Sequence, residues 1–275
     1  MRRTLIILLG FGLLVSFVIV MMKSGGKEFP TTPSKPRTTA LSALEVAQEL
    51  LMTVKVGQDP TPFSEELCSL GEEDMRGTLT DDRSKRAFWL NVYNAFGQLL
   101  LEQEPVDLRD ADVRTAHYGT RRICVAGRRL SLNDIEHGML RGSLIWWSKG
   151  YLAKWSSNAF EQDFRVPVDA RIHFALNCGA ASCPAIAFYD ADHLGEQLDL
   201  AVRVYLKDDV AYDRSTNTVR ISALFDWYAN DFGGPSGTLD FLRKYGLIPT
   251  DAEPELVFNE YDWTVLTRSF RDQAS

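Results

Sequence analysis

Residues 84–102 read SKRAFWLNVYNAFGQLLLE, and this stretch decides the fold that the sequence predicts. Aromatic and aliphatic residues recur on every turn and leave little of the circumference polar, so we expect a helix buried on nearly all sides. Asp81 or Asp82 is placed to cap its N-terminus, and Pro105 ends it. A long buried helix of this kind requires a globular domain around it.

Three amide side chains interrupt the apolar surface of this helix. Asn91, Asn94 and Gln98 are spaced at i, i+3 and i+7, which places them on one stripe. A buried amide without a hydrogen-bond partner costs about 1–3 kcal/mol, so each amide needs a partner. Two interpretations stay open: the amides fix helix packing, or Asn91 or Asn94 faces a cavity and orients a catalytic group.

The remaining segments interleave helical and strand patterns without regular βα units. Helical spacing occurs at 40–54, 131–141 (capped by Ser131 or Asn133), 192–206, 225–228 and 238–245, a hairpin pattern at 121–130, and strand patterns at 171–176, 218–221 and 257–265. The sequence therefore predicts an α+β fold, a single mixed domain with a central antiparallel or mixed sheet packed by helices. We expect this domain to occupy residues 40–275.

The N-terminus carries an uncharged stretch, residues 4–22, directly after Arg2 and Arg3. It approaches the roughly 20 apolar residues of a spanning helix, so we predict a transmembrane anchor. A cleaved signal peptide is the rival interpretation, but no A-x-A pattern ends the run. The two arginines favour a cytoplasmic N-terminus. Residues 23–39, rich in Gly, Pro, Ser and Thr, then read as a flexible linker to an extracytoplasmic domain, periplasmic in a Gram-negative cell.

The composition excludes one class of partner. Of 275 residues, 45% are hydrophobic and 24% charged, which is ordinary for a chain that buries a core. The formal net charge is −7, whereas a nucleic-acid surface needs clustered Lys and Arg. We therefore expect no nucleic-acid partner.

Residues 171–184, RIHFALNCGAASCP, form the candidate functional centre. Alternating apolar residues over 171–176 predict a strand, and His173 lies on its opposite face. Gly179 allows the chain to turn back, which would bring Cys178 near His173. A thiolate next to an imidazolium is a nucleophile for acyl transfer, because the histidine lowers the thiol pKa and then relays the proton.

Several interpretations of Cys178 and Cys183 stay open. The pair forms a disulfide or packs as small apolar groups, and an outward location permits the disulfide. Alternatively, one cysteine acts with His173 or His137 as a nucleophile. Zinc binding lacks a second ligand pair, so we assign no metal and no cofactor. Thiol–disulfide exchange is a further reading, weakened because the C-x4-C spacing differs from C-x-x-C.

Glu136 and His137 lie on the predicted short helix. Because consecutive helical residues diverge by about 100°, they cannot easily point at one metal ion. An HExxH-type zinc site is excluded, since it needs two histidines at i and i+4. His137 is read as a hydrogen-bonded structural residue or as a second candidate base.

Five blocks of the chain together resemble the domain of unknown function 547 (DUF547) family. The blocks are FWLNVYNAF at 88–96, LSLNDIEHGMLR at 130–141, RIHFALNCGAASCPAI at 171–186, ISALFDWYANDFG at 221–233 and YDW at 261–263. The likeness runs roughly from residue 79 to 265. This chain departs from the pattern at Val265-Leu266, where we expect an asparagine. The resemblance implies a fold and shared positions, but no mechanism.

Carried over residue by residue, the resemblance implies one set of site positions. They are Asn91, Tyr93, Asn94, Glu136, His137, Arg171, His173, Asn177, Cys178, Ser182, Cys183 and Pro184. Within this set we expect Cys178 to be the nucleophile, His173 the base and Asn94 the orienting amide, with His137 as a further catalytic group. Asn91, Tyr93, Glu136, Arg171, Asn177, Ser182 and Cys183 are expected to bind substrate.

The activity expected from these residues is that of a thiol-dependent hydrolase or acyltransferase. Its substrate would be an amide or thioester, on a small molecule or peptide that the sequence does not identify. The alternative is a non-enzymatic ligand-binding or scaffold domain braced by a Cys178–Cys183 disulfide. Cys68 and Cys124 lie outside the motifs and are expected to be core thiols.

Overall fold

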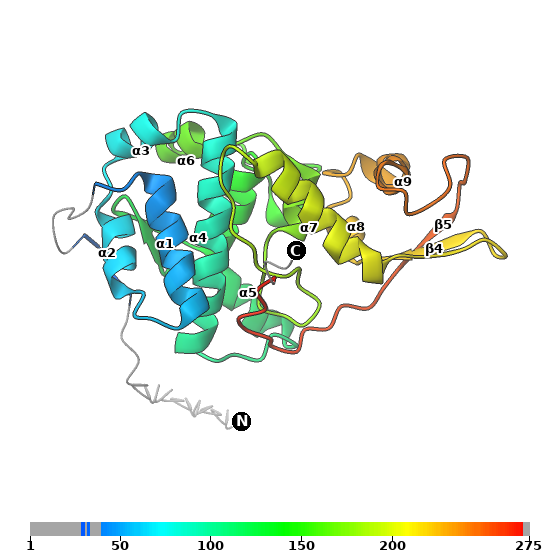
Figure 1. Cartoon of the computed structure of the whole chain (residues 1–275), viewed down its shortest axis with the longest axis horizontal. Coiled ribbons are helices and arrows are strands. Elements are labelled where there is room, and N and C mark those ends of the chain that lie inside the picture. The colour runs from blue at the N-terminus through cyan, green and yellow to red at the C-terminus, as the bar shows by residue number, and fades with distance from the viewer. Residues whose placement is uncertain (1–28, 31, 34–39, 272–275) are drawn as a thin grey trace, which may run out of the picture.

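Helix α4 (Asp82–Gln103) is the central element of the computed structural model, which describes residues 29–30, 32–33 and 40–271 (Figure 1). The Asp81 side chain caps it by accepting the Ser84 N–H at 2.8 Å. Every residue from 86 to 101 is buried. The predicted helix, its cap and its burial are confirmed.

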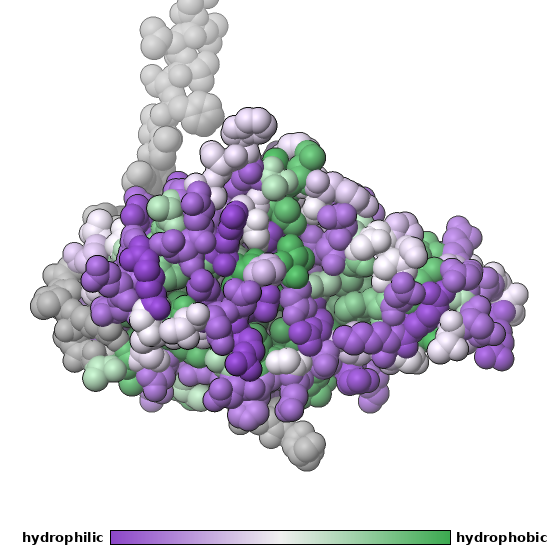
Figure 2. Space-filling view, turned by 90° about the horizontal axis from the view of Figure 1, so that it is seen from above, coloured by the Kyte–Doolittle hydropathy of each residue, from purple (hydrophilic) through white to green (hydrophobic). Residues whose placement is uncertain are grey.

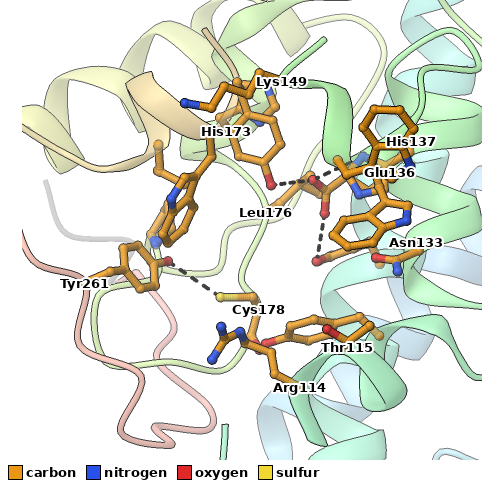
Figure 3. A pocket seen from close by; sticks show the side chains of 18 of the residues that line it. Arg114, Thr115, Asn133, Glu136, His137, Lys149, His173, Leu176, Cys178 and Tyr261 are labelled. Carbon is orange, nitrogen blue, oxygen red and sulfur yellow. Dashed lines mark hydrogen bonds and ion pairs between the residues drawn. The ribbon is translucent and has the colours of Figure 1, made fainter. Parts of the chain in front are cut away.

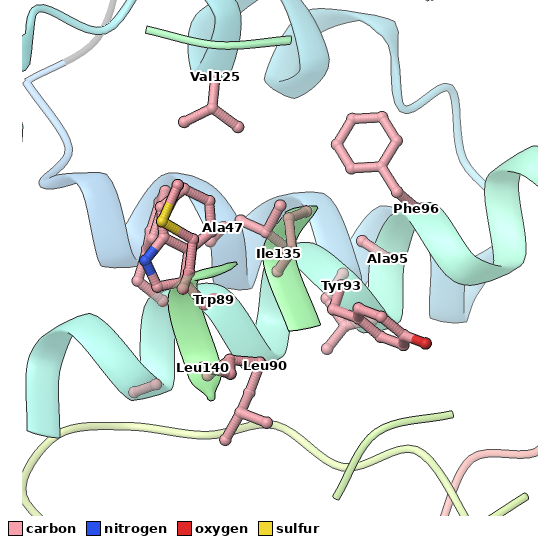
Figure 4. Packing of buried hydrophobic residues seen from close by; sticks show 14 of the residues in the cluster. Ala47, Trp89, Leu90, Tyr93, Ala95, Phe96, Val125, Ile135 and Leu140 are labelled. Carbon is pink, nitrogen blue, oxygen red and sulfur yellow. The ribbon is translucent and has the colours of Figure 1, made fainter. Parts of the chain in front are cut away.

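The helices between residues 43 and 164 pack around α4. They are α1 (Ala43–Val56), α2 (Thr61–Ser69), α3 (Glu72–Thr78), α5 (Ala111–Gly119) and α6 (Ala159–Phe164). α1, predicted from residues 40–54, begins at a capping box between Ser42 and Glu45 and lies alongside α4. Figure 4 shows Ala47 of α1, Trp89 of α4 and Ile135 among the residues packed in this core.

A second group of helices forms a separate core at the other end of the molecule. It comprises α7 (Leu194–Asp209), α8 (Leu224–Trp227) and α9 (Gly234–Lys244), packed around Phe174 and Phe225. The helices predicted at 192–206, 225–228 and 238–245 are confirmed, with shifted ends. Figure 1 shows this group apart from α1, on the far side of α4.

The described residues hold two small sheets and no central one. β1 (Ile123–Val125) and β2 (Arg128–Leu130) form the predicted antiparallel hairpin. β3 (Ala211–Asp213), β4 (Thr218–Ile221) and β5 (Glu255–Phe258) form a sheet in which β3 and β4 are antiparallel and β4 and β5 parallel. The α+β class holds, but the predicted central sheet is wrong, because α4 fills the centre.

Residues 171–176 form no strand, so that prediction is wrong. The segment contains η3 (Ala170–Phe174), a 3₁₀-helix whose N-cap Asp169 accepts the Arg171 N–H. Ile172 packs into the core around α4, whereas Phe174 packs into the second core. Because this short segment contributes to both cores, all five side chains from 172 to 176 are buried. The alternation of apolar residues therefore does not mark one face of a sheet.

The helix predicted at 131–141 is present in an unusual form. η1 (Asp134–Leu140) is a π-helix, in which the Arg141 N–H reaches the Glu136 carbonyl at 2.9 Å. The Ser131 hydroxyl accepts the Asp134 N–H at 3.0 Å, as expected of a cap. A 3₁₀ turn, η2 (Trp146–Ser148), follows.

The C-terminal segment returns from the sheet to the helical half. The strand predicted at 257–265 is confirmed only at its start, since β5 ends at Phe258. The chain after β5, red in Figure 1, runs back beneath α7 and α8. There Val265 pairs with Ala180, and Phe270 pairs with Ile186.

Two disulfides join the four cysteines. Cys68 pairs with Cys124 and Cys178 with Cys183, so the prediction of core thiols at Cys68 and Cys124 is wrong. Both of those residues lie in the core. Cys68 and Cys124 are 56 residues apart in the sequence, and the fold brings them together. The sequence alone does not show this proximity.

The predicted anchor, residues 4–22, lies outside the described residues, as does most of the predicted linker, residues 23–39. Within the described part of the chain, no helix is both long and apolar enough to cross a bilayer. Phe29, which is described, contacts Phe96 of α4 edge to face, with ring centroids 5.5 Å apart. The face in Figure 2 is mainly polar, with apolar side chains reaching the surface near its middle.

Candidate functional site

A cavity of about 470 Å³ lies where the two cores meet. Its lining comes from α4, α5, η1, η2, η3, α8 and the returning C-terminal segment (Figure 3). The residues are Tyr93, Arg114, Thr115, Tyr118, Asn133, Glu136, His137, Trp146, Trp147, Lys149, His173, Leu176, Cys178, Pro184, Leu224, Trp227, Tyr228, Tyr261 and Trp263. The cavity therefore draws on segments spread over most of the described chain.

Glu136 presents a carboxylate to this cavity. One oxygen accepts the Tyr228 hydroxyl at 2.6 Å and the other accepts the Tyr93 hydroxyl at 3.2 Å (Figure 3). Burial alone would raise the pKa of Glu136, but His137, the Tyr228 hydrogen bond and the charge of Arg141 outweigh it and lower that pKa. Glu136 is therefore ionised at neutral pH although it is only 7% exposed.

A buried chain of polar contacts runs behind Glu136. His137 Nδ1 lies 2.7 Å from Arg141 Nη1, and Arg141 holds Asp231 through two bonds of 2.6 and 2.9 Å. His173 Nε2 lies 2.8 Å from the same Asp231 carboxylate. Arg141 and Asp231 are both fully buried at the side chain, so this bidentate pair is shielded from solvent.

The contacts of His137 fix its tautomer. Because a guanidinium only donates, His137 Nδ1 must accept, and the proton of the neutral ring is on Nε2. Burial is the main cause that lowers the pKa of His137, to about 4, and the charge of Arg141 adds to it. His137 is therefore neutral at physiological pH and offers an N–H donor rather than a base.

His173 donates a hydrogen bond to the buried network, whereas His137 accepts one. Burial lowers the pKa of His173 despite the hydrogen bond to Asp231, so the ring is neutral. The Asp231 carboxylate accepts from Nε2, which leaves Nδ1 as an acceptor without a hydrogen-bond partner among the described residues. The ring stacks on Tyr228 with centroids 3.7 Å apart. His173 is thus held in one orientation, with Nδ1 as its remaining acceptor.

Gly150 allows a turn to close over this network. Its φ is +87°, and a Cβ there would lie 2.3 Å from Asp231 Oδ1. The Asn230 side chain also donates to the Gly150 carbonyl at 2.8 Å. Any larger residue at position 150 would push the turn away from Asp231.

Aromatic rings make up much of the cavity wall. Trp263 stacks on Trp227 at 5.5 Å and contacts Tyr261 at 4.7 Å between centroids. At the rim, Trp146 and Trp147 are 55% and 61% exposed. The cavity therefore combines the ionised Glu136 carboxylate with walls made of large aromatic rings.

The Cys178–Cys183 disulfide forms part of the same wall. Cys178 lines the cavity, and its Sγ is bonded to Cys183. No cysteine thiol is free in this form, so Cys178 carries no thiolate. The interpretation in which these two cysteines form a disulfide is the one that the structure has, and Gly179 turns the chain between them with φ +85°.

The predicted amides lie outside the cavity and hold its backbone. Asn91 exchanges two hydrogen bonds with the backbone of Tyr189, at 2.8 and 3.1 Å. Asn94 donates to the Ala175 carbonyl and accepts the Asn177 N–H, each at 2.9 Å. The amides on α4 therefore hydrogen-bond to the backbone of irregular segments, as a neighbouring strand would in a sheet. These contacts fit the interpretation in which the amides fix packing.

Four other predicted residues also lie outside the cavity lining, namely Cys183 and the three described next. Arg171 pairs with Asp169 and Asp199. The Asn177 side chain donates to the Pro184 carbonyl at 2.7 Å, and the Ser182 hydroxyl accepts the Asp262 N–H at 2.9 Å. Of the predicted set, the structure brings Tyr93, Glu136, His137, His173, Cys178 and Pro184 to the cavity.

Several residues of the cavity and its polar network were not predicted, although they lie in sequence blocks that resemble the family. Trp227, Tyr228 and Asp231 belong to the block 221–233, and Tyr261 and Trp263 belong to YDW. Polar and aromatic residues at fixed places in these blocks were the available signal. No group of three metal-ligating side chains occurs within the described ranges.

The fold and the site define a mixed α+β domain whose cavity has aromatic walls and contains a buried Glu and two His. Residues 78–206 match the family model described as "Protein of unknown function, DUF547", which confirms the resemblance to that family over this range. No curated protein and no solved structure matches the chain. The matched range contains Tyr93, Glu136, His137 and His173, whereas Asp231 lies beyond it.

Proposed function

We propose that this domain binds a small organic cation, with the cationic group directed at Glu136. The observation that carries this proposal is the charge of that carboxylate. Among the described residues, Glu136 has no ion pair with a Lys or Arg, and its one ion-pair neighbour, His137 at 3.8 Å, is neutral. A buried carboxylate that no Lys or Arg contacts directly favours a positively charged ligand.

The walls support the same ligand class. A cation over an aromatic ring is attracted by the ring quadrupole, and the attraction grows when water is excluded. Two rings of this cavity already accept guanidinium groups on their faces, Arg114 over Trp263 at 4.0 Å and Arg141 over Tyr228 at 4.7 Å. An ammonium inside the cavity would meet similar faces and the Glu136 charge together.

Choline and its neutral isostere 3,3-dimethylbutan-1-ol test this proposal. Both are titrated into the full chain, and binding is followed by calorimetry and by the fluorescence of the cavity tryptophans. We expect choline to bind at least about tenfold more tightly, because a desolvated cation–π contact contributes about 2 kcal/mol. Glu136→Gln should remove most of that preference, whereas the exposed Glu196→Gln should retain it. Equal binding of the two ligands would overturn the proposal.

A thiol-dependent hydrolase or acyltransferase is a second candidate. The observation that favours it is that Cys178 lines the same cavity as His173, whose Nε2 is held by Asp231. Because Cys178 is bonded to Cys183, this activity would belong to the reduced chain. Thioester hydrolysis that appears on reduction, disappears in Cys178→Ser and persists in Cys183→Ser would support it.

We also propose that the domain lies outside the cytoplasmic membrane, tethered by residues 4–22. Two disulfides support an oxidising compartment, since such bonds are rare in the cytosol. Trp146, Trp147 and Trp155 are exposed, and Trp is enriched where proteins meet the membrane interface.

A further inference from the structure

The sulfur of Cys183 accepts three hydrogen bonds. The backbone N–H groups of Cys178 and Ala180 lie 3.1 and 3.2 Å from it, and the Tyr261 hydroxyl lies 3.3 Å away. A sulfur in a disulfide is a weak acceptor, whereas a thiolate is a strong one. These donors therefore suit a negative charge on Cys183 more than the neutral disulfide.

The two sulfurs differ in access. Cys178 lines the cavity, whereas Cys183 is outside the lining and 8% exposed. Besides its disulfide partner, Cys178 Sγ contacts the Tyr261 hydroxyl, at the longer distance of 3.6 Å (Figure 3). A nucleophile in the cavity would reach Cys178, and the leaving sulfur would be the one that the donors surround.

We propose that the Cys178–Cys183 disulfide exchanges with low-molecular-weight thiols that enter the cavity. A thiolate attacks Cys178 Sγ, the Cys178–Cys183 bond breaks, and Cys183 leaves as a thiolate held by the two N–H groups and Tyr261. A second thiol then attacks the mixed disulfide on Cys178. Two thiols become one small disulfide, and the protein gains the two electrons and two protons as two thiols. The reverse sequence reoxidises the protein.

The protonation state of Tyr261 agrees with Cys183 being the leaving sulfur. Burial raises the pKa of Tyr261 well above its usual value, so its hydroxyl stays protonated and remains a donor to the thiolate. A leaving thiolate that is stabilised in this way departs faster, and it makes the disulfide more oxidising. The proposal rests on these sulfur contacts and not on cation binding, so either can fail while the other stands.

The second disulfide provides an internal reference. Cys68 and Cys124 are 0% and 1% exposed and do not line the cavity. A thiol in solution has no path to them while the domain stays folded. The same sample therefore contains one bond expected to exchange and one expected to resist.

The experiment equilibrates the full chain in buffers of reduced and oxidised glutathione, followed by acid quench, alkylation and mass spectrometry of each cysteine pair. We expect Cys178–Cys183 to reach half reduction at a glutathione ratio at least about tenfold less reducing than Cys68–Cys124. Tyr261→Phe should shift that midpoint about tenfold toward stronger reducing conditions, because it removes one bond to the thiolate. Tyr212→Phe, on the distant hairpin, should leave it unchanged.

Trapping identifies the attacked sulfur. In Cys183→Ser the mixed disulfide cannot be resolved within the protein, so after reaction with oxidised glutathione a glutathione mixed disulfide should accumulate on Cys178 and one glutathione thiol should be released. In Cys178→Ser, Cys183 should be modified at least tenfold more slowly. Equal midpoints for the two disulfides, or glutathione found preferentially on Cys183, would overturn the proposal even if both variants fold as the parent does.

Discussion

At the scale of single residues, the buried site contains two neutral histidines joined by a fixed ion pair. Arg141 cannot lose its proton, so it dictates that His137 accepts, while Asp231 dictates that His173 donates. Each ring therefore has one nitrogen committed to the network and one left for a ligand. His137 can donate and His173 can accept, which is the pair of roles needed to move a proton across a bound molecule.

The neutrality of His137 predicts a loss of stability in acid. Its pKa in the folded chain, about 4, lies below the unfolded value of 6.5, so the unfolded chain binds the proton first. The stabilisation is complete above pH 6.5 and is lost as the pH falls toward 4, by about 3 kcal/mol in total. In His137→Gln, whose amide oxygen can still accept from Arg141, urea unfolding at pH 7.5 and 4.5 should show a loss smaller by about 2–3 kcal/mol.

An exposed histidine supplies the control for this measurement. His193 lies on the surface, and the hydrogen bond to Asp190 raises its pKa, so its linkage has the opposite sign. His193→Gln should therefore show an acid loss at least as large as that of the parent chain. If His137→Gln lost as much stability in acid as His193→Gln, the neutral state of His137 would be contradicted.

At the scale of elements, the amide side chains of α4 hold the backbone segments that line the cavity. Asn94 binds backbone groups on both sides of Leu176, a cavity residue, and Gln98 donates to the Asn177 side chain at 2.9 Å. Segments without a sheet still need partners for buried backbone groups. The amides supply these partners, so a helix holds loops in place where a strand would otherwise be needed.

Asn94→Ala should therefore be strongly destabilising. It leaves the Ala175 carbonyl and the Asn177 N–H buried without their partner, at about 1–3 kcal/mol for each. We expect urea unfolding to report a loss of about 2–5 kcal/mol. Gln48→Ala, which removes one bond to Tyr189 from a partly buried position on α1, should lose less than about 1.5 kcal/mol. Similar losses in the two variants would show that the Asn94 clamp is dispensable.

The same elements show how far the sequence could predict this fold. The burial of α4 was predictable because apolar residues surround its whole axis, a pattern that no exposed helix has. The segment 171–176 was not, because alternation in a short apolar run fits both a strand and a turn that supplies two cores. Asp231 could not be joined to His173 from spacing, since 58 residues separate them and only the tertiary fold brings them to 2.8 Å.

At the scale of the whole molecule, the cavity exists because two cores are packed against one another and the chain crosses between them. η3 contributes to both cores, and the segment after β5 returns to lay Tyr261 and Trp263 on the cavity. The site is therefore completed by residues far from the blocks that hold its acids and histidines. Any change that separates the two cores should open the cavity before it unfolds either one.

The two disulfides close loops of very different length, and this predicts unequal contributions to stability. Cys68–Cys124 joins residues 56 apart, whereas Cys178–Cys183 joins residues 5 apart. Loop-closure entropy alone gives about 4 kcal/mol for the long loop and about 2 kcal/mol for the short one. Urea unfolding of Cys68→Ala/Cys124→Ala and of Cys178→Ala/Cys183→Ala should show losses in that order, and full reduction of the parent chain should lose at least as much as the first variant. A larger loss from the short loop would mean that Cys178–Cys183 braces the cavity wall beyond its entropy, and would weaken the case for its exchange.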